Sequence, residues 1–377
     1  GTSDFNDAWA IGNPNYQTEF TTSSSSDYYG VDYSPDGEFI VTGSEDDFVR
    51  IWNASTWTNV RSVNTGENIN GVDWSPDGNY IAAARNDDSI EIFYSSNLTS
   101  LHGSISVDVG GGDQVNNVEF SPDSSSVAVA IGRSGNGGTN GEVAVISVQT
   151  GSELYAVNPN GEDRFYDLAH SPDGRYMALA GNSDIYIVNT TSRATTWTIS
   201  NPPAAVNAIA WSPDGNYISM CGGWEGSSAS FDMYQYSNGN NAWNRIWQKT
   251  TSTSCGSTTF SHDSSQVVAG MYWYQTDGAT AYVYQSNTGT QVDSFSGPRP
   301  GNCQSGNNNQ CGTIYGVAWS PDATHIVTAH GRNDEGVYYW FADIDEDNDG
   351  YNTTDQGDGV VDAFPSDGTQ WNDTDAD

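Results

Sequence analysis

Lysine is almost absent from this sequence of 377 residues, and Lys249 is the only one. Lysine and arginine together number 11 against 48 aspartates and glutamates, so the formal net charge is −37. Binding to nucleic acid needs a cationic surface, and so does electrostatic attachment to anionic membranes, so neither partner is expected. The charge balance favours cations as partners.

Long apolar stretches are missing as well. No run approaches the roughly 18 consecutive apolar residues of a membrane-spanning helix, so we expect no membrane span. The sequence contains no nucleophile elbow, phosphate loop, dinucleotide fingerprint or metalloprotease motif. The five histidines are scattered without metal-ligand spacing. These absences predict a protein that is not an enzyme.

Cysteine is scarce, and its pattern favours disulfides over zinc. The spacings are wider than the paired spacings of zinc sites, and no histidine lies near them. Two disulfides would indicate export, and four cysteines allow three pairings. Five Asn-x-Ser/Thr triplets are candidate glycosylation sites of an extracellular or cell-surface protein. The cysteines are Cys221, Cys255, Cys303 and Cys311, and the candidate glycosylation sites are Asn53, Asn97, Asn189, Asn352 and Asn372.

A repeated turn motif is the strongest signal in the sequence. Ser-Pro-Asp-Gly or a close variant occurs seven times, and the copies are 41, 46, 50, 41, 49 and 59 residues apart. Proline fixes φ, aspartate caps the turn and glycine accepts positive φ. Repeats of this length predict the blades of an all-β, seven-bladed propeller. The copies begin at Ser34, Ser75, Ser121, Ser171, Ser212, Ser261 and Ser320.

Each copy predicts a blade of four strands. A short alternating strand precedes the turn, two more apolar strands follow it, and the fourth strand is more polar, as an outer edge strand should be. The last repeat lacks a fourth strand, and the alternating segment 16–20 can supply it and so close the ring. We therefore expect an N-terminal segment at 1–27, the propeller at 28–341 and an acidic tail at 342–377.

Residues 43–53, Gly-Ser-Glu-Asp-Asp-Phe-Val-Arg-Ile-Trp-Asn, resemble the second half of a WD repeat, with Asn53 at the place of the terminal aspartate. The Gly-His pair of that family is missing from every repeat. The resemblance covers about residues 28–341 and implies the fold, but it says almost nothing about function. In the topology of that family, the end of the second strand and the start of the next blade share one face. It therefore implies that Cys221 lies near Cys255, while Cys303 can bond Cys311 within one loop.

Three acidic residues occupy the same position of the innermost strand in the first three repeats. They are Asp32, Asp73 and Glu119, whereas later repeats have alanine there, or Thr259 in the sixth. Solvated carboxylates in the central channel, a polar channel wall and a cation site are all compatible with this pattern.

The composition changes at residue 342. Residues 342–377 contain 11 aspartates and Glu346 but no lysine or arginine. Alternating aspartates followed by Gly350 suit Ca²⁺, which takes 6–8 oxygen ligands, although Gln356 stands where an EF-hand loop closes with glutamate. The tail resembles the thrombospondin type 3 class of calcium repeats, and a disordered, solvated tail is the alternative. The predicted calcium-binding residues are Asp343, Asp345, Asp347, Asp349, Tyr351, Asp355, Asp358, Asp362, Asp367, Asp373, Asp375 and Asp377.

The sequence ends in Asp373-Thr374-Asp375-Ala376-Asp377, which is half of a calcium loop. A neighbouring copy could complete the coordination, and such a head-to-tail contact propagates into rings or filaments. We therefore expect a non-enzymatic extracellular or cell-surface structural or interaction module that self-assembles through its tail, with cell-surface proteins or glycans as further partners. The alternative is a propeller enzyme or glycan-binding protein with its site at the mouth of the channel.

Overall fold

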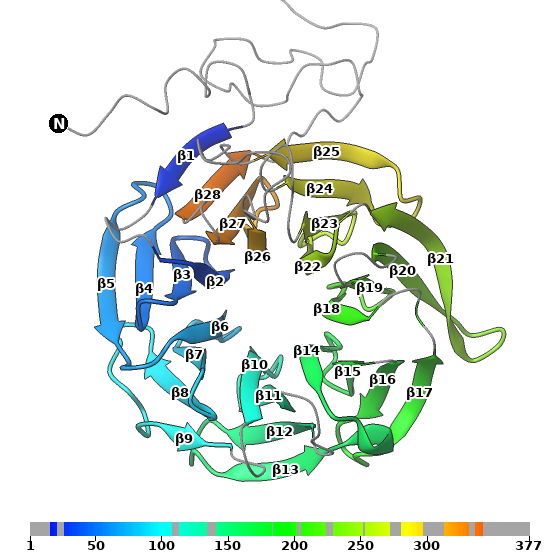
Figure 1. Cartoon of the computed structure of the whole chain (residues 1–377), viewed down its shortest axis with the longest axis horizontal. Helices are drawn as coiled ribbons and strands as arrows, with labels where there is room; N and C mark the ends of the chain where they lie inside the picture. Colours follow the sequence, from blue (N-terminus) through cyan, green and yellow to red (C-terminus); the bar gives the residue numbers. More distant parts are fainter. Residues whose placement is uncertain are drawn as a thin grey trace, which may run out of the picture.

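The structure is a computed structural model, and it describes residues 16–20, 26–107, 113–133, 141–182, 184–200, 202, 205–223, 229–251, 253–271, 280–296, 313–331 and 336–341. Its strands form seven four-stranded antiparallel sheets arranged around a central opening (Figure 1). This confirms the predicted all-β propeller and its number of blades. The predicted calcium-binding tail, 342–377, lies outside the described residues. No helix in the described part of the chain is long and apolar enough to cross a membrane.

Six blades follow the order of the chain from the innermost strand outward. Blades 1 to 3 comprise β2 (Tyr28–Tyr33), β3 (Phe39–Ser44), β4 (Phe48–Asn53), β5 (Asn59–Asn64), β6 (Ile69–Trp74), β7 (Tyr80–Arg85), β8 (Ser89–Tyr94), β9 (Ile105–Ser106), β10 (Asp113–Phe120), β11 (Ser126–Arg133), β12 (Glu142–Ser147) and β13 (Glu153–Val157). Blades 4 to 6 comprise β14 (Phe165–His170), β15 (Tyr176–Gly181), β16 (Asp184–Asn189), β17 (Thr195–Ser200), β18 (Val206–Trp211), β19 (Tyr217–Gly222), β20 (Ala229–Ser237), β21 (Ala242–Thr251), β22 (Cys255–Phe260), β23 (Gln266–Met271), β24 (Thr280–Gln285) and β25 (Gln291–Ser296).

Blade 7 is completed from the other end of the described chain. It contains β26 (Thr313–Trp319), β27 (His325–Gly331) and β28 (Gly336–Phe341), and its outer strand is β1 (Tyr16–Phe20). Strand β1 pairs antiparallel with β28, with Tyr16 opposite Trp340 and Phe20 opposite Val337. The predicted closure by residues 16–20 is therefore confirmed, and β28 has partners along both edges.

The repeated turn is held by its serine and aspartate. In blade 1, Ser34 Oγ donates to Asp36 Oδ1 at 2.6 Å and accepts from the backbone N–H of Phe39 at 2.9 Å. The serine-to-aspartate bond recurs in all seven copies. The fourth position adopts positive φ even where it is not glycine, as at Ser124, Ser264 and Ala323. The motif is thus explained by local turn structure.

The apolar core lies between neighbouring blades. Seven buried clusters occur in the described chain, one at each junction of two blades. Between blades 1 and 2, for example, Val41 and Ile51 pack with Ile69 and Ile81, all fully buried. Fully burying such a side chain contributes roughly 1.5–3 kcal/mol, so the ring is stabilised by contacts that cross every junction.

Two cysteines join neighbouring blades. Cys221 of β19 and Cys255 of β22 form a disulfide with their Cα atoms 5.1 Å apart, as the predicted pairing requires. Their separation of 34 residues corresponds to a stabilisation of about 4 kcal/mol in the chain-entropy description of cross-links. Cys303 and Cys311 lie outside the described residues.

Candidate functional site

The innermost strand of every blade has a β-bulge at the same place. Each bulge follows the first residues of the strand, where one extra residue interrupts the pairing with the second strand. It changes the direction of the side chains that follow, so that two levels of side chains face the central channel. The residues that resume pairing after the bulge are Gly30, Gly71, Asn117, Asp167, Ala208, Ser257 and Gly316.

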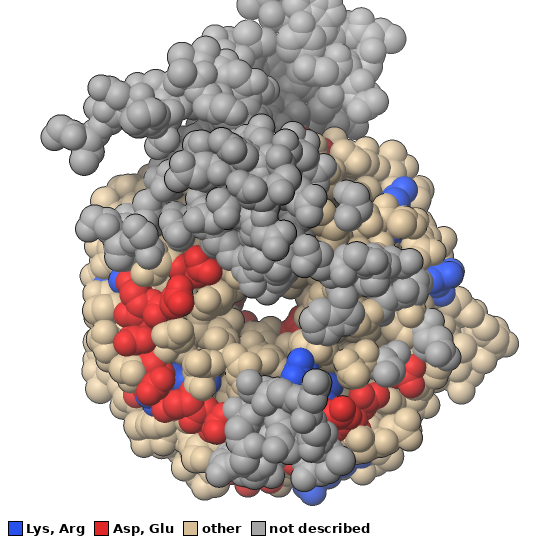
Figure 2. Space-filling model, viewed as in Figure 1, with Lys and Arg blue, Asp and Glu red and all other residues tan. Residues whose placement is uncertain are grey.

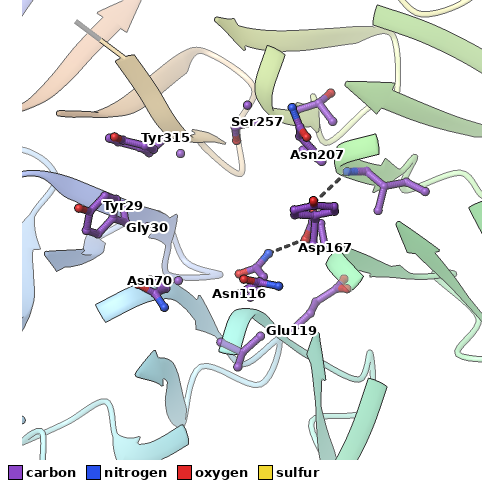
Figure 3. Close-up of a pocket in the computed structure, with 18 of the residues that line it drawn as sticks. Tyr29, Gly30, Asn70, Asn116, Glu119, Asp167, Asn207, Ser257 and Tyr315 are labelled. Atoms are coloured by element: carbon purple, nitrogen blue, oxygen red, sulfur yellow. Dashed lines mark hydrogen bonds between the residues drawn. The ribbon is translucent and has the colours of Figure 1, made fainter. Parts of the chain in front are cut away.

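These strands surround a cavity of about 970 Å³ along the axis of the ring. Figure 3 shows side chains from successive blades around it, among them Asn70, Asn116, Asp167 and Asn207.

Glycine is required where neighbouring blades approach most closely. A Cβ atom at Gly71 would lie 2.4 Å from Asn117 Oδ1, and one at Gly30 would lie 2.7 Å from the backbone nitrogen of Val72.

The three carboxylates singled out in the sequence line this channel and link successive blades. Asp32 Oδ2 accepts the backbone N–H of Trp74, in blade 2, at 2.8 Å. Asp73 and Glu119 accept backbone N–H groups of blades 3 and 4 in the same way, at 2.6 and 3.0 Å. Of the three alternatives drawn from the sequence, a polar channel wall fits this geometry, and each carboxylate connects its blade to the next one.

Burial perturbs two of these groups strongly. It raises the pKa of Asp32 to about 6, although hydrogen bonds from the backbone of Trp74 and Tyr33 act in the opposite direction. Burial also raises the pKa of Asp73 well above its usual value, and repulsion from the carboxylates of Asp32 and Glu119 adds to the effect. Because two ionised carboxylates repel, the neighbouring charge of Asp32 favours the protonated form of Asp73.

A fourth carboxylate, Asp167, was missed by the sequence comparison. In blade 4, the position that corresponds to Asp32, Asp73 and Glu119 is Ala169. Asp167 stands two residues before it, and the bulge brings Asp167 to the channel. Its Oδ1 accepts from Asn117 Nδ2 at 2.6 Å and its Oδ2 from the backbone of Ile209 at 2.9 Å. Burial raises its pKa to about 7. The bulge that recurs in every innermost strand explains why Asp167 reaches the channel. The spacing of residues in the sequence does not reveal this bulge.

A second level of the wall consists of amides. Asn70 donates its side-chain N–H to the carbonyl of Val115 at 2.8 Å, and Asn116 donates to the carbonyl of Phe165 at 2.6 Å. Asn207 bonds the carbonyl of Cys255 at 3.1 Å in the same manner. All three bonds connect one blade to the next. The channel wall therefore contains side-chain bonds at each junction from blades 1 and 2 to blades 5 and 6. Within the described residues, no group of three or more ligating side chains could hold a metal ion.

Acidic side chains gather over blades 1 and 2 on one face of the ring (Figure 2). We call it the upper face: it carries the connections between second and third strands and those between blades, and Figure 2 shows it. The lower face carries the other turns. Red side chains follow blades 1 and 2 beside the central opening in Figure 2. We define this acidic arc as Glu45, Asp46, Asp47, Glu67, Asp87 and Asp88.

Two buried arginines lie under the acidic arc and neutralise only part of it. Arg50 pairs with Asp46 at 2.5 Å, and Arg85 lies 3.2 Å from Asp87. Within the described part of the chain, no lysine or arginine nitrogen lies within 4.0 Å of a carboxylate of Glu45, Asp47 or Glu67. The mouth of the channel is thus strongly negative on the side of blades 1 and 2.

The other predicted site residues fall into two groups. The predicted calcium ligands in the tail, together with Asn352 and Asn372, lie outside the described residues. Asn53 and Asn189 end the third strands β4 and β16, and Asn97 lies in the turn between β8 and β9, all on the lower face. Each side-chain oxygen accepts backbone N–H bonds of its own turn, for example from Thr56 to Asn53 at 2.9 Å. Glycosylation of these asparagines stays a prediction.

The fold and channel define a seven-bladed β-propeller, and comparison with known proteins agrees. The family described as WD domain, G-beta repeat, matches residues 15–53, 57–93 and 194–227. The β-propeller domain of Cps50 (Swd1) from Myceliophteria thermophila has a TM-score of 0.69 with this chain at 14% identity, and the match covers 87% of this chain and 99% of that one. No curated protein sequence matches significantly. At this identity the similarity concerns the fold alone.

Proposed function

We propose that this propeller is a non-enzymatic interaction module of the extracellular space or cell surface, and that it binds a positively charged segment of a partner across its upper face. The single observation that carries the proposal is the acidic arc beside the channel mouth. Its six carboxylates outnumber the two arginines beneath them, so a cationic partner would gain attraction without displacing an existing ion pair.

The channel itself supports a binding role over catalysis. Its carboxylates are engaged with backbone N–H groups of the next blade, so their oxygens serve to join blades. A general base needs an oxygen or nitrogen directed at a substrate proton. The non-enzymatic assignment rests on this use of the carboxylates.

Binding of an arginine-rich peptide tests the proposal. The variant Glu45→Gln/Glu67→Gln removes two charges from the acidic arc, and we expect it to weaken binding about tenfold at low salt, which corresponds to about 1.4 kcal/mol. Fluorescence anisotropy of the labelled peptide, measured at two salt concentrations, gives the affinity. Because surface charges are screened, the difference between wild type and variant should shrink as salt rises.

The matched control changes the net charge equally at a distance from the arc. Glu38→Gln/Glu153→Gln removes two exposed carboxylates, from a lower-face turn and from the outer strand β13, and should leave the affinity close to that of wild type. Equal weakening by both variants would mean that only the net charge of −37 attracts the peptide, and the arc would then not be the docking site.

A second candidate function is calcium-dependent self-assembly through the tail. It is favoured by the 12 acidic residues, without a single basic one, among residues 342–377. Alternating carboxylates of this kind suit a hard cation. We expect the full chain to form oligomers in millimolar calcium that dissociate when EGTA is added. Light scattering measures this, and an unchanged monomer in both conditions would rule out the assembly.

A further inference from the structure

A second cavity lies on the lower face, where blade 7 meets blade 1. Its volume is about 620 Å³, and its walls are aromatic: Tyr33 and Trp57 come from blade 1, and His325 and Tyr339 come from blade 7. The rings of Trp57 and Tyr339 have centroids 3.9 Å apart, and His325 stacks on Tyr339 at 4.7 Å. The cavity is thus formed by rings from two blades that only the closure of the propeller brings together.

The backbone at Trp57 is in an unfavourable conformation. Its φ is +56°, in the left-handed region that bulky residues rarely adopt. Blades 3 and 6 place Gly151 and Gly289 at the corresponding turn position, where the same hydrogen bond closes the turn. Such strain costs on the order of 1–3 kcal/mol, and the corresponding residues of blades 2 and 4, Leu98 and Arg193, adopt the same positive φ. Other residues form the same turn, so the turn does not require tryptophan. What Trp57 adds at this position is its indole ring.

Two carboxylates stand at the rim of this cavity. Asp36 and Asp322 belong to the repeated turns of blades 1 and 7, and both are exposed. Oδ1 of each accepts the turn's own bonds, from Ser34 at 2.6 Å and from Ser320 at 2.5 Å. The second carboxylate oxygen takes no part in these turns. Both groups therefore present negative charge to the cavity.

Among the described residues that line this cavity, none is a lysine or an arginine. His325 is the one basic group among them, and burial lowers its pKa, with the carboxylate of Asp322 acting in the opposite direction, so its ring is neutral at neutral pH. The faces of aromatic rings carry partial negative charge. The cavity thus combines aromatic rings with two carboxylates, and both kinds of group attract a cation.

The junction of blades 3 and 4 gives an internal precedent. There, the turn position of Trp57 is occupied by Arg193, whose guanidinium carbon lies 4.5 Å from the ring centroid of Tyr155. That junction contains a cation from the chain itself. At the junction of blades 7 and 1, the same position holds another aromatic ring, and the described residues that line the cavity supply no lysine or arginine.

We propose that the cavity between blades 7 and 1 is a binding site for an organic ammonium group, held against Trp57 and Tyr339 and balanced by Asp36 and Asp322. The site is separate from the acidic arc, which lies on the opposite face. Because its walls belong to both blades, a bound ligand links the two sides of the junction that β1 closes. Binding to the folded ring alone raises its unfolding temperature by mass action.

Choline and its uncharged carbon isostere, dimethylbutanol, test this site on the full-length protein. We expect calorimetric titration to show saturable binding of choline and at least about tenfold weaker binding of dimethylbutanol, because only choline gains from the carboxylates. The variants Trp57→Gly and Asp322→Asn should each weaken choline binding about tenfold. Trp57→Gly suits the positive φ and so keeps the turn, while Asp322→Asn retains the oxygen that accepts from Ser320.

The control variant is Trp197→Leu. The ring of Trp197 contacts that of Tyr176 on blade 4, with the centroids 5.2 Å apart, and Trp197 is not among the residues that line the cavity, so choline binding should be unchanged. Thermal unfolding without ligand verifies that each variant is folded. Three results would each overturn the proposal: equal affinity for choline and dimethylbutanol, no binding of choline to the wild type, or binding of choline to Asp322→Asn as tight as to the wild type. Binding of a methyl glycoside in place of choline would assign the cavity to sugars and overturn it as well.

Discussion

Deletion of residues 1–20 is expected to lower the free energy of unfolding by about 4 kcal/mol, since a backbone hydrogen bond contributes about 1 kcal/mol net and β1 has four registered positions opposite β28. The deletion leaves one edge of β28 unpaired, beside the fully buried ring of Trp340. An exposed strand edge also promotes pairing with other chains. Urea unfolding followed by far-ultraviolet circular dichroism measures the loss, and light scattering detects association.

A peptide that contains residues 16–20 provides the control. Added to the truncated protein, it should restore stability in proportion to its concentration, because it binds the folded ring and not the unfolded chain. A peptide of the same composition in scrambled order should have no effect. If the truncated protein were as stable as the complete chain, closure of the ring by β1 would have no energetic role.

The stability of the protein is expected to fall as pH rises from 5 to 8, and Asp167 contributes most clearly to this trend. Its pKa of about 7 in the folded state exceeds the usual value of about 3.9 in unfolded chains. The folded state therefore holds more protons between these values, and its stability decreases as pH rises through the folded pKa. At about 1.4 kcal/mol per pKa unit, the change from pH 5 to pH 8 amounts to roughly 2–3 kcal/mol.

The turn aspartates act in the opposite direction at lower pH. At Asp322, burial alone would raise the pKa, but hydrogen bonds from Ser320 and Thr324 outweigh it and hold the pKa below the usual value. Stability from such groups is present above the unfolded pKa and is lost as pH falls below it. The maximum should therefore lie between about pH 4 and pH 6. The aspartates with lowered pKa are Asp77, Asp123, Asp173, Asp214, Asp263 and Asp322.

The variant Asp167→Asn isolates the contribution of the channel. It cannot ionise, so its stability should change less between pH 5 and pH 8 than that of the wild type. Its absolute stability should be lower, because one amide N–H replaces an oxygen that accepts from Asn117, Leu168 or Ile209. Urea unfolding of both proteins across this pH range gives the comparison. Parallel pH profiles would show that Asp167 is not the group that titrates.

Much of the fold follows from local patterns in the sequence. The turn that begins at Ser34 recurs seven times because each blade needs the same bond from serine to aspartate, so the motif counts the blades directly. The missing fourth strand of the last repeat predicted that residues 16–20 complete blade 7. Asp32, Asp73 and Glu119 were found as a set because they share one position relative to that turn.

The sequence by itself determined the number of blades, the order of their strands and the strand that closes the ring, since these depend on alternation and turn chemistry within short segments. Tertiary structure alone decided which side chains meet. A bulge brings Asp167 to the channel although its spacing differs from that of the other carboxylates. Closure of the ring brings Trp57 against Tyr339, more than half of the chain away. Such contacts depend on the curvature of the whole ring, which no local segment encodes.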